Sequence, residues 1–358
     1  MLRTLAGLVT IAFSAGFASG QTSAPPTSDR VFHFTHTEGA NNFQQVATLL
    51  RTITDMKQAS VDEAQKTVTV NGTGAQLDLA EWLFTEMDNA QVPAPNNANS
   101  ASLAYRMQDK QGEDAIRVFY LSNTATVPMF QEAATAIRTV ADLRRAFTYN
   151  STRAMVIRGT GEQIALAAWL VGQLGLSVPQ ASAAPEYHLP GNGTGLSGAD
   201  PETVVRVLHA SQAATVQDFQ ELATAIRTIT DMRRVFTYNS SRAMLVRGTG
   251  EQIGLAVWTL QQLDKPAIGQ SVPQSFPSSA IYEFVTPYDR DNIVRVFYLP
   301  QTATVQDFQK VAKSIRETSN LRRVFTCNAP RALAVRGTID QVAVAERMIR
   351  DLVTPPQP

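Results

Sequence analysis

Apolar residues in this chain follow two different periods, and the same succession of periods occurs four times. In one copy, Val118-Phe119-Tyr120-Leu121 is a short β-branched and aromatic run, which predicts a strand. The next segment, Phe130 to Val140, has apolar residues three and four positions apart and predicts a helix with one buried stripe. Strand-like runs at 146–149 and 154–157 flank the turn-prone segment 150–153, so they predict a β-hairpin.

A second helix is predicted directly after the hairpin, where each copy has Gly-Thr. The threonine is followed three residues later by glutamine, the pattern of a capping box, and the glycine supplies the turn before it. A phosphate-binding loop is the competing interpretation, but the Lys-Ser/Thr pair and the longer glycine spacing of such loops are absent. The predicted caps are Thr73 with Gln76, Thr160 with Gln163, Thr249 with Gln252, and Thr338 with Gln341.

The spacing of the copies sets the domain organisation. The glycines at 72, 159, 248 and 337 are 87, 89 and 89 residues apart, so a block of about 60 residues alternates with a spacer of about 28. The predicted fold class is α+β: a tandem array of four β-α-β-β-α modules, each a three-stranded sheet with two helices on one face. Within the spacers, the runs 104–107 and 281–285 can add a strand to a sheet edge. We expect modules at 30–89, 115–175, 203–265 and 292–353, with linkers at 90–114, 176–202 and 266–291.

The first residues predict export. Arg3, an apolar run from Leu5 to Phe17 and the small residues 18–20 form a secretory signal, so residues 1–20 are expected to be removed. No later stretch has the ~20 apolar residues that a membrane helix needs. We therefore expect a periplasmic or secreted chain, with a position peripheral to the outer membrane as one alternative. The 31 basic and 31 acidic residues balance, which argues against polyanion binding by the whole chain. The single cysteine, Cys327, stands where two other copies have tyrosine, so it is interpreted as a packing residue.

A tryptophan marks the second helix of the first three copies. The positions that are apolar in every copy cluster on one side of this helix, and the tryptophan lies nearly opposite, facing away from its own sheet. Two interpretations stay open: the ring forms an interface, or the following spacer folds back over it. The last copy has Arg347 at this position, and terminal repeats are commonly altered to face water. The tryptophans are Trp82, Trp169 and Trp258.

Arginines recur at the same positions of the second and third copies. Interleaved with aromatic residues, they could indicate nucleic-acid binding, but export and the balanced charge argue against it. A solvated sheet face, or a basic rim that meets an acidic rim on a neighbouring subunit, is favoured. The candidate interface residues are Arg144, Arg145, Arg153, Arg158, Arg233, Arg234, Arg242 and Arg247.

Residues for catalysis are scarce. His33 and His209 occupy a position that is tyrosine in the other copies, which favours a strand packing role. His33 and His36 lie three residues apart on a predicted strand, where side chains alternate between faces, so they are unsuited to share a metal ion. No nucleophile-elbow motif, paired-histidine helix or carboxylate dyad is present. We therefore predict no catalytic, metal or cofactor-binding residues and no enzyme activity.

The succession of elements resembles a known family. The segment 236–249, Phe-Thr-Tyr-Asn-Ser-Ser-Arg-Ala-Met-Leu-Val-Arg-Gly-Thr, with the helix end 261–264, Gln-Gln-Leu-Asp, resembles the secretin N-terminal, ring-building domain. The resemblance covers about two thirds of the chain and implies domains that stack in the periplasm and oligomerise below an outer-membrane pore. No segment resembles the pore domain, so we expect that the chain is not a complete channel.

The expected function follows from the repeats and this resemblance. We expect an exported, non-enzymatic scaffold that binds protein: copies of itself, or a secretin-type secretion or pilus assembly. The alternative is a periplasmic binding protein that captures a peptide or an envelope polymer along sheet edges or the arginine-bearing face. A hydrolase is the third possibility and would require a deep pocket around His33 and His36.

Overall fold

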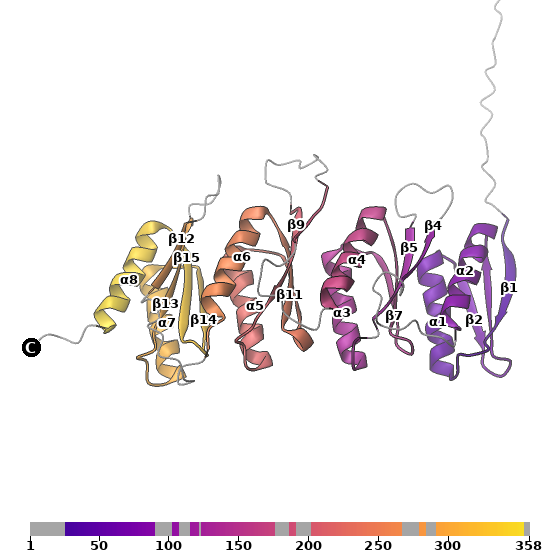
Figure 1. Ribbon diagram of the computed structural model, residues 1–358, viewed down its shortest axis with the longest axis horizontal. Helices are drawn as coiled ribbons and strands as arrows, with labels where there is room; N and C mark the ends of the chain where they lie inside the picture. The colour runs from indigo at the N-terminus through magenta and orange to yellow at the C-terminus, as the bar shows by residue number, and fades with distance from the viewer. Residues whose placement is uncertain are drawn as a thin grey trace, which may run out of the picture.

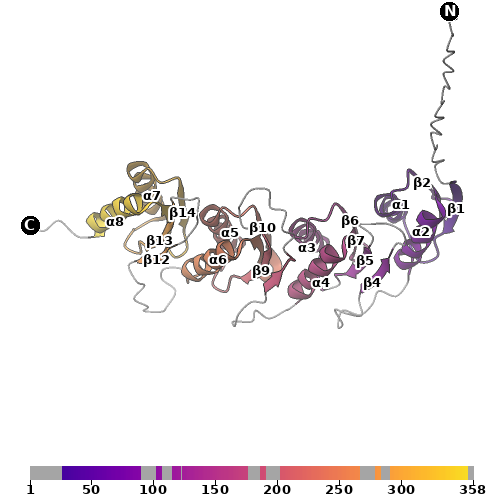
Figure 2. The same cartoon turned by 90° about the horizontal axis from the view of Figure 1, so that it is seen from above.

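The structure is a computed structural model that describes residues 26–89, 102–106, 115–121, 123–175, 186–190, 202–266, 279–283 and 291–353. The predicted signal peptide lies outside the described residues, as does the glycine-rich segment 191–195. Figure 1 shows four modules in a row, with β1 (Ser28–His33) at one end and α8 (Ile339–Val353) at the other. Figure 2 shows that every module repeats nearly the same orientation.

The predicted α+β class is confirmed: each module pairs a small antiparallel sheet with two helices. The first module has a three-stranded sheet in the order β1-β3-β2. Its register places Val31 opposite Thr69, and Val61 opposite Val68. Besides β1, the module contains α1 (Ala40–Thr54), β2 (Gln58–Asp62), β3 (Thr67–Gly72) and α2 (Gly74–Met87).

The sheets of the other three modules have a fourth strand, which corrects the prediction of three strands in every module. The spacers supply it: β4 (Ser102–Arg106), β8 (Glu186–His188) and β12 (Ser279–Glu283) pair antiparallel with the opening strand of the module that follows. The sequence predicted a strand in the first and third spacers but not in the second. The strand orders are β4-β5-β7-β6, β10-β11-β9-β8 and β12-β13-β15-β14.

The remaining elements repeat the pattern of the first module. The second contains β5 (Ala115–Tyr120), α3 (Val127–Val140), β6 (Arg145–Tyr149), β7 (Ala154–Gly159) and α4 (Gly161–Leu174). The third contains β9 (Val204–His209), α5 (Val216–Thr230), β10 (Arg234–Tyr238), the 3₁₀ turn 239–241, β11 (Ala243–Gly248) and α6 (Gly250–Leu263). The fourth contains β13 (Ile293–Tyr298), α7 (Val305–Ser319), β14 (Arg323–Cys327), β15 (Ala332–Gly337) and α8.

The second helix of each module begins at the predicted threonine. At α4, Gln163 N–H donates to Thr160 Oγ1 at 3.2 Å, and Thr160 N–H donates to Gln163 Oε1 at 3.0 Å. Glycine is required before this threonine for space, and not for the turn flexibility that the sequence suggested. A Cβ on Gly159 would stand 2.8 Å from Gln163 Oε1, so the capping side chain needs the space that glycine leaves. The same reciprocal bonds join Thr249 with Gln252 and Thr338 with Gln341, and Thr73 N–H donates to Gln76 Oε1.

A residue in the left-handed conformation follows the first helix of each module, directly or, in the second module, after Ala141. The φ angles are 62° at Asp55, 53° at Asp142, 55° at Asp231 and 54° at Asn320. Aspartate and asparagine adopt this conformation more readily than other residues with a Cβ, because their short polar side chains bond locally. The chain therefore places one short polar side chain at the same end of every module, and in the first three modules it lies next to the module that follows.

Candidate functional site at the module junctions

The modules touch because the helix pair of each of the first three modules is buried on two sides. One side of α1 and α2 covers its own sheet, and the other side packs against the sheet of the second module, in one continuous apolar cluster. Val46, Leu49 and Ile53 of α1 share this cluster with Val118 and Val156 of the second module. At the second and third junctions, a single apolar cluster likewise contains residues of both modules. The layers therefore alternate sheet, helices, sheet, helices along the rod (Figure 1).

This arrangement corrects the expectation of a solvated sheet face. In the second to fourth modules, the face turned away from the module's own helices is covered by the helices of the preceding module. The sequence held a signal for it: every residue of β7 is buried, and β15 is buried throughout as well. Strands covered on both faces appear as continuous apolar runs rather than alternating ones.

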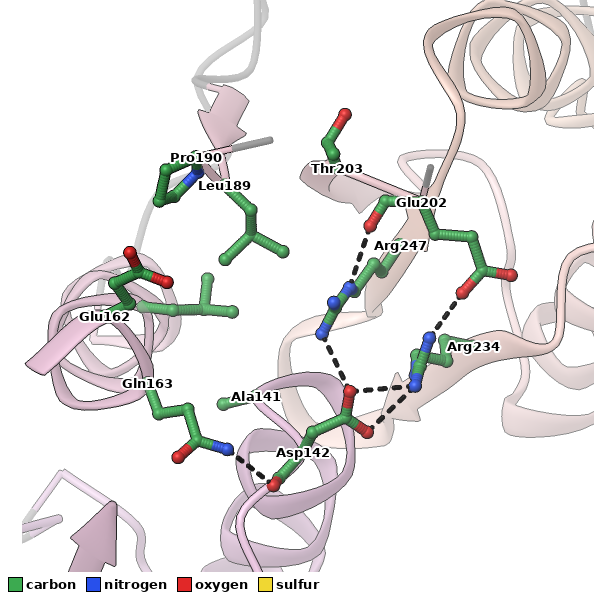
Figure 3. Close-up of a pocket in the computed structure, with 11 residues that line it drawn as sticks. Ala141, Asp142, Glu162, Gln163, Leu189, Pro190, Glu202, Thr203, Arg234 and Arg247 are labelled. Carbon is green, nitrogen blue, oxygen red and sulfur yellow. Dashed lines mark hydrogen bonds and ion pairs between the residues drawn. The ribbon is translucent and has the colours of Figure 1, made fainter. Parts of the chain in front are cut away.

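A polar cluster closes each junction beside the apolar contact, and Figure 3 shows the one between the second and third modules. Asp142, at the end of α3, accepts bonds from Arg234 Nη2 at 2.8 and 2.9 Å and from Arg247 Nη1 at 3.2 Å. Arg247 Nη1 also donates to the carbonyl oxygen of Val140 at 2.9 Å. Arg234 pairs with Glu202, and Gln163 of the capping box donates to the carbonyl oxygen of Asp142. Two arginines of one module are thus held by the helix end of the other.

The other two junctions have the same geometry. At the first, Asp55 pairs with Arg145 and Arg158 at 3.1 Å each, and Arg158 donates to the carbonyl oxygen of Ile53 at 2.8 Å. At the third, Asp231 pairs with Arg323 and Arg336, and Arg336 donates to the carbonyl oxygen of Ile229. The inner arginines, Arg158 and Arg336, are only 3% and 2% exposed. Burying a guanidinium is tolerated because each is bonded to a carbonyl oxygen and a carboxylate.

A second polar contact lies on the other side of each junction. Asn239 donates its backbone N–H and its side-chain amide to Glu132 of the preceding module. Asn328 bonds Glu221 in the same way, at 3.0 and 2.7 Å. At the first junction the acceptor is Gln45, which receives the backbone N–H of Asn150 at 3.3 Å. Each of the three junctions therefore has an apolar centre flanked by two polar contacts, one on each side.

The predicted tryptophans lie beside the spacer strands. The ring centroids of Trp82 and Tyr105 are 5.3 Å apart, and those of Trp169 and Tyr187 are 5.6 Å apart. Trp258 and Tyr282 are 5.3 Å apart. Each tyrosine belongs to β4, β8 or β12, so a spacer residue lies against each half-buried ring, as the second interpretation of the tryptophans expected. Because each spacer strand joins the following sheet, the tryptophan also contacts the next module.

One junction position is tyrosine in two modules and histidine in a third. Tyr120 donates its hydroxyl to the carbonyl oxygen of Glu86 at 3.4 Å, and Tyr298 donates to that of Gln262 at 2.9 Å. Burial raises the pKa of Tyr120 to about 12, with a smaller contribution from the Glu86 carboxylate, and burial raises the pKa of Tyr298 to about 12. At the middle junction this position is His209, whose Nδ1 is buried without a hydrogen-bond partner in the described part of the chain. Burial lowers the pKa of His209.

The remaining candidate arginines do not reach the junctions. Arg153 has a φ of 54° in its hairpin turn and donates to the carbonyl oxygen of Thr124 in its own module. Arg242 donates to the carbonyl oxygen of Ala214 in the same way. Arg144 and Arg233 are exposed. The structure therefore brings four of the candidate arginines to junctions, Arg145, Arg158, Arg234 and Arg247.

The carboxylates that receive these arginines were missed in the sequence analysis. Asp55, Asp142 and Asp231 follow the first helices and are the natural residues for a left-handed helix end, so they carried no separate functional signal. One feature of the sequence could have indicated their role at the junctions: the fourth module, which no module follows in the structure, has Asn320 in place of the aspartate. The acidic rim predicted on a neighbouring subunit is found here on the preceding module of the same chain.

The described surface has hollows but none that gathers catalytic groups. A cavity of about 400 Å³ between the second and third modules is lined by Asp142, Glu202, Arg234 and Arg247, which are already paired with one another (Figure 3). Within the described residues, no group of three or more His, Cys, Asp or Glu side chains could hold a metal ion. His36 Nδ1 lies 2.8 Å from the carbonyl oxygen of Asp88. None of the helices in the described ranges is long and apolar enough to cross a membrane.

Comparisons with known proteins give structural matches only. No protein-family model and no curated protein sequence matches the chain. Aeromonas hydrophila ExeD is 12% identical with a TM-score of 0.15, over 67% of this chain and 42% of that one. The N-terminal domain of the secretin XcpQ from Pseudomonas aeruginosa is 15% identical with a TM-score of 0.17, over 44% of this chain and 68% of that one.

A third match is the pilotin–secretin AspS–GspD complex of ETEC, at 13% identity and a TM-score of 0.15, over 68% of this chain and 39% of that one. The chain thus spans about two fifths of the ExeD and GspD chains that it matches. The matched proteins include secretin N-terminal domains, at low TM-scores and over part of each chain.

Proposed function

We propose that this chain is a non-enzymatic scaffold of the bacterial envelope that holds protein partners at fixed positions along a stiff rod. The observation that carries the proposal is the repetition of one junction three times. At each junction, one apolar cluster extends from one module into the next. A polar contact lies on each side of this cluster. A chain whose neighbouring modules share their cores keeps a constant spacing between their surfaces.

The partner class follows from the sequence resemblance. The segment 236–249 resembles the secretin N-terminal domain, and export is predicted from residues 1–20. The proposed partner is therefore a secretin-type channel, a pilus or secretion assembly, or copies of the chain itself, on the periplasmic side of the outer membrane.

Site-specific crosslinking in the producing bacterium tests this function. A photo-reactive amino acid is placed at half-buried Thr48 in the first module and, separately, at its exposed equivalent Lys313 in the fourth. We expect discrete protein adducts from both positions, with partners that differ between the two ends. Arg247→Glu is the matched variant, because it reverses the charge facing Asp142 and breaks the middle of the rod. Adducts that consist of polysaccharide or short peptides, or the absence of protein adducts at both positions, would contradict the scaffold.

A second candidate function is supported by a set of exposed cations. Two positions of every module are basic and exposed, one near the end of the first helix and one just before the hairpin. In the second module, Arg138 and Arg144 line one surface hollow. The full set, called here the basic column, is Arg51, Lys57, Arg138, Arg144, Arg227, Arg233, Arg316 and Arg322.

The basic column favours an acidic peptide or an anionic envelope polymer as ligand. Poly-glutamate provides a simple probe, because its binding should weaken steeply as salt screens the charges. Replacing Arg138, Arg144, Arg227 and Arg233 by alanine removes half of the basic column and should weaken binding strongly. Poly-glutamate binding that survives both high salt and these substitutions would remove this candidate.

A further inference from the structure

The faces that meet inside the rod can be recognised by comparing equivalent positions. Leu222, Ala225 and Ile229 of α5 are 4%, 0% and 0% exposed. The equivalent residues of α7 are Val311, Ser314 and Thr318, and the last two are exposed. The burial in α5 is therefore supplied by the module that follows. We call the surface formed by positions 221, 222, 225, 229 and 231, and their equivalents in other modules, the helix face.

The complementary surface is identified in the same way. Ile116 and Val118 of β5 are 1% and 0% exposed, because the helices of the first module cover them. The equivalent residues of β1 are Asp29 and Val31, and Val31 is 49% exposed. We call the surface formed by positions 116, 120, 145, 150 and 158, and their equivalents, the sheet face.

Both outermost faces lack the residues that form junctions. On the sheet face of the first module, both junction arginines are replaced, by Gln58 and Asn71, and Asn71 donates to Asp29 within the face. On the helix face of the fourth module, the junction aspartate is replaced by Asn320, and the carboxylate or amide acceptor by Lys310. Apolar residues are exchanged as well, to Asp29 at one end and to Ser314 and Thr318 at the other.

We infer that the helix face of the fourth module and the sheet face of the first do not bind each other, so copies of this chain do not extend the rod head to tail. The inference goes beyond a scaffold function, because it confines contact between copies to the sides of the rod.

One pair of opposite charges would favour head-to-tail contact between two copies. Head-to-tail stacking would bring Lys310 of one copy to Glu63 of another, since Glu63 occupies the position of Asn150, and these charges attract. Both side chains are exposed, and Lys310 already lies 3.6 Å from Asp307. Exposed ion pairs contribute little to association, whereas the missing apolar contacts form the centre of every internal junction.

Restoring the two faces in separate full-length proteins tests the inference. The first variant gives module 1 the sheet face of module 2: Asp29→Ile, His33→Tyr, Gln58→Arg, Glu63→Asn and Asn71→Arg. The second gives module 4 the helix face of module 3: Lys310→Glu, Val311→Leu, Ser314→Ala, Thr318→Ile and Asn320→Asp. These positions are exposed or half-exposed, so the modules themselves should fold, which circular dichroism verifies.

Each variant has one restored end, so a mixture should form a one-to-one complex and then stop. Light scattering after size exclusion should show a roughly two-fold rise in mass for the equimolar mixture, and no rise for either variant mixed with the wild type. The control carries Gln58→Glu and Asn71→Glu in place of the arginines and should give no complex.

Two results would overturn the inference. One is a mixture of folded variants that does not associate, because the exchanged residues would then not decide stacking. The other is a carbodiimide cross-link between Lys310 and Glu63 of two wild-type copies, because the unmodified ends would then meet.

Discussion

Arg336 and Ile229 are 107 residues apart in the chain, yet a guanidinium nitrogen of Arg336 lies 2.9 Å from the carbonyl oxygen of Ile229. The first two junctions repeat this contact between an arginine of one module and the helix end of the preceding one. Because Ile229 lies in the last turn of α5, where carbonyl oxygens lack a donor within the helix, the arginine satisfies a group that the helix cannot satisfy itself.

Arg336→Ala should loosen the third junction strongly. The substitution leaves the carbonyl of Ile229 without its donor, although Asp231 keeps its ion pair with Arg323. A buried group that loses its partner costs about 1–3 kcal/mol. Urea unfolding followed by circular dichroism should show a less stable transition for the fourth module. Arg322→Ala is the control, because Arg322 is exposed and should change stability by less than about 0.5 kcal/mol. Equal effects of the two substitutions would contradict a special role for the junction arginine.

Asp231→Asn should remove the negative charge at the junction while it preserves the backbone conformation of the helix end. Asparagine holds the same left-handed conformation in the fourth module, at Asn320, so the helix end is preserved. Asp231 is 46% exposed, so its loss should cost only about 1 kcal/mol or less at low salt. The difference from wild type should shrink as salt screens the ion pairs. An effect of the same size at low and high salt would mean that the charge is not what matters.

Cys327 provides a native probe of the third junction. The thiol is 2% exposed and belongs to the apolar cluster shared by the third and fourth modules, and burial raises its pKa. A thiol reagent should therefore react only when the junction opens or the module unfolds. Arg336→Ala should accelerate labelling by a factor of about 10, which corresponds to 1.4 kcal/mol of easier opening. Fast labelling of the folded wild type would show that the junction does not protect the thiol.

His209 should make the middle junction sensitive to mild acid. Because burial lowers its pKa in the folded chain, the unfolded chain binds more protons at pH values between the folded pKa and the ordinary 6.5. Stability should therefore be complete above pH 6.5 and fall as the pH is lowered through this window.

His209→Tyr should remove this pH dependence and stabilise the middle junction. By analogy with Tyr120 and Tyr298, the new hydroxyl can donate to the carbonyl oxygen of Gln173, for a gain of about 1 kcal/mol. Unfolding midpoints measured from pH 7.5 down to pH 5 compare the two proteins. An unchanged slope in the tyrosine variant would show that another group titrates.

The sequence by itself determined the module and its repetition. The apolar periods of three and four residues located the first helices, and the Thr-x-x-Gln pattern located the start of the second ones, because both signals depend on residues within a few positions of each other. The exchange of tryptophan for Arg347 also distinguished the last copy.

Only the tertiary structure decided what covers the second face of each sheet. The partners Arg158 and Ile53 are 105 residues apart, and no local pattern relates a strand arginine to a helix carbonyl in another module. The aspartates at the helix ends serve the backbone turn and the junction at once, so the sequence could be explained by the turn alone. The physical reason is that local elements follow from neighbours in the chain, whereas the surface that a module presents acquires a partner only when the modules stack.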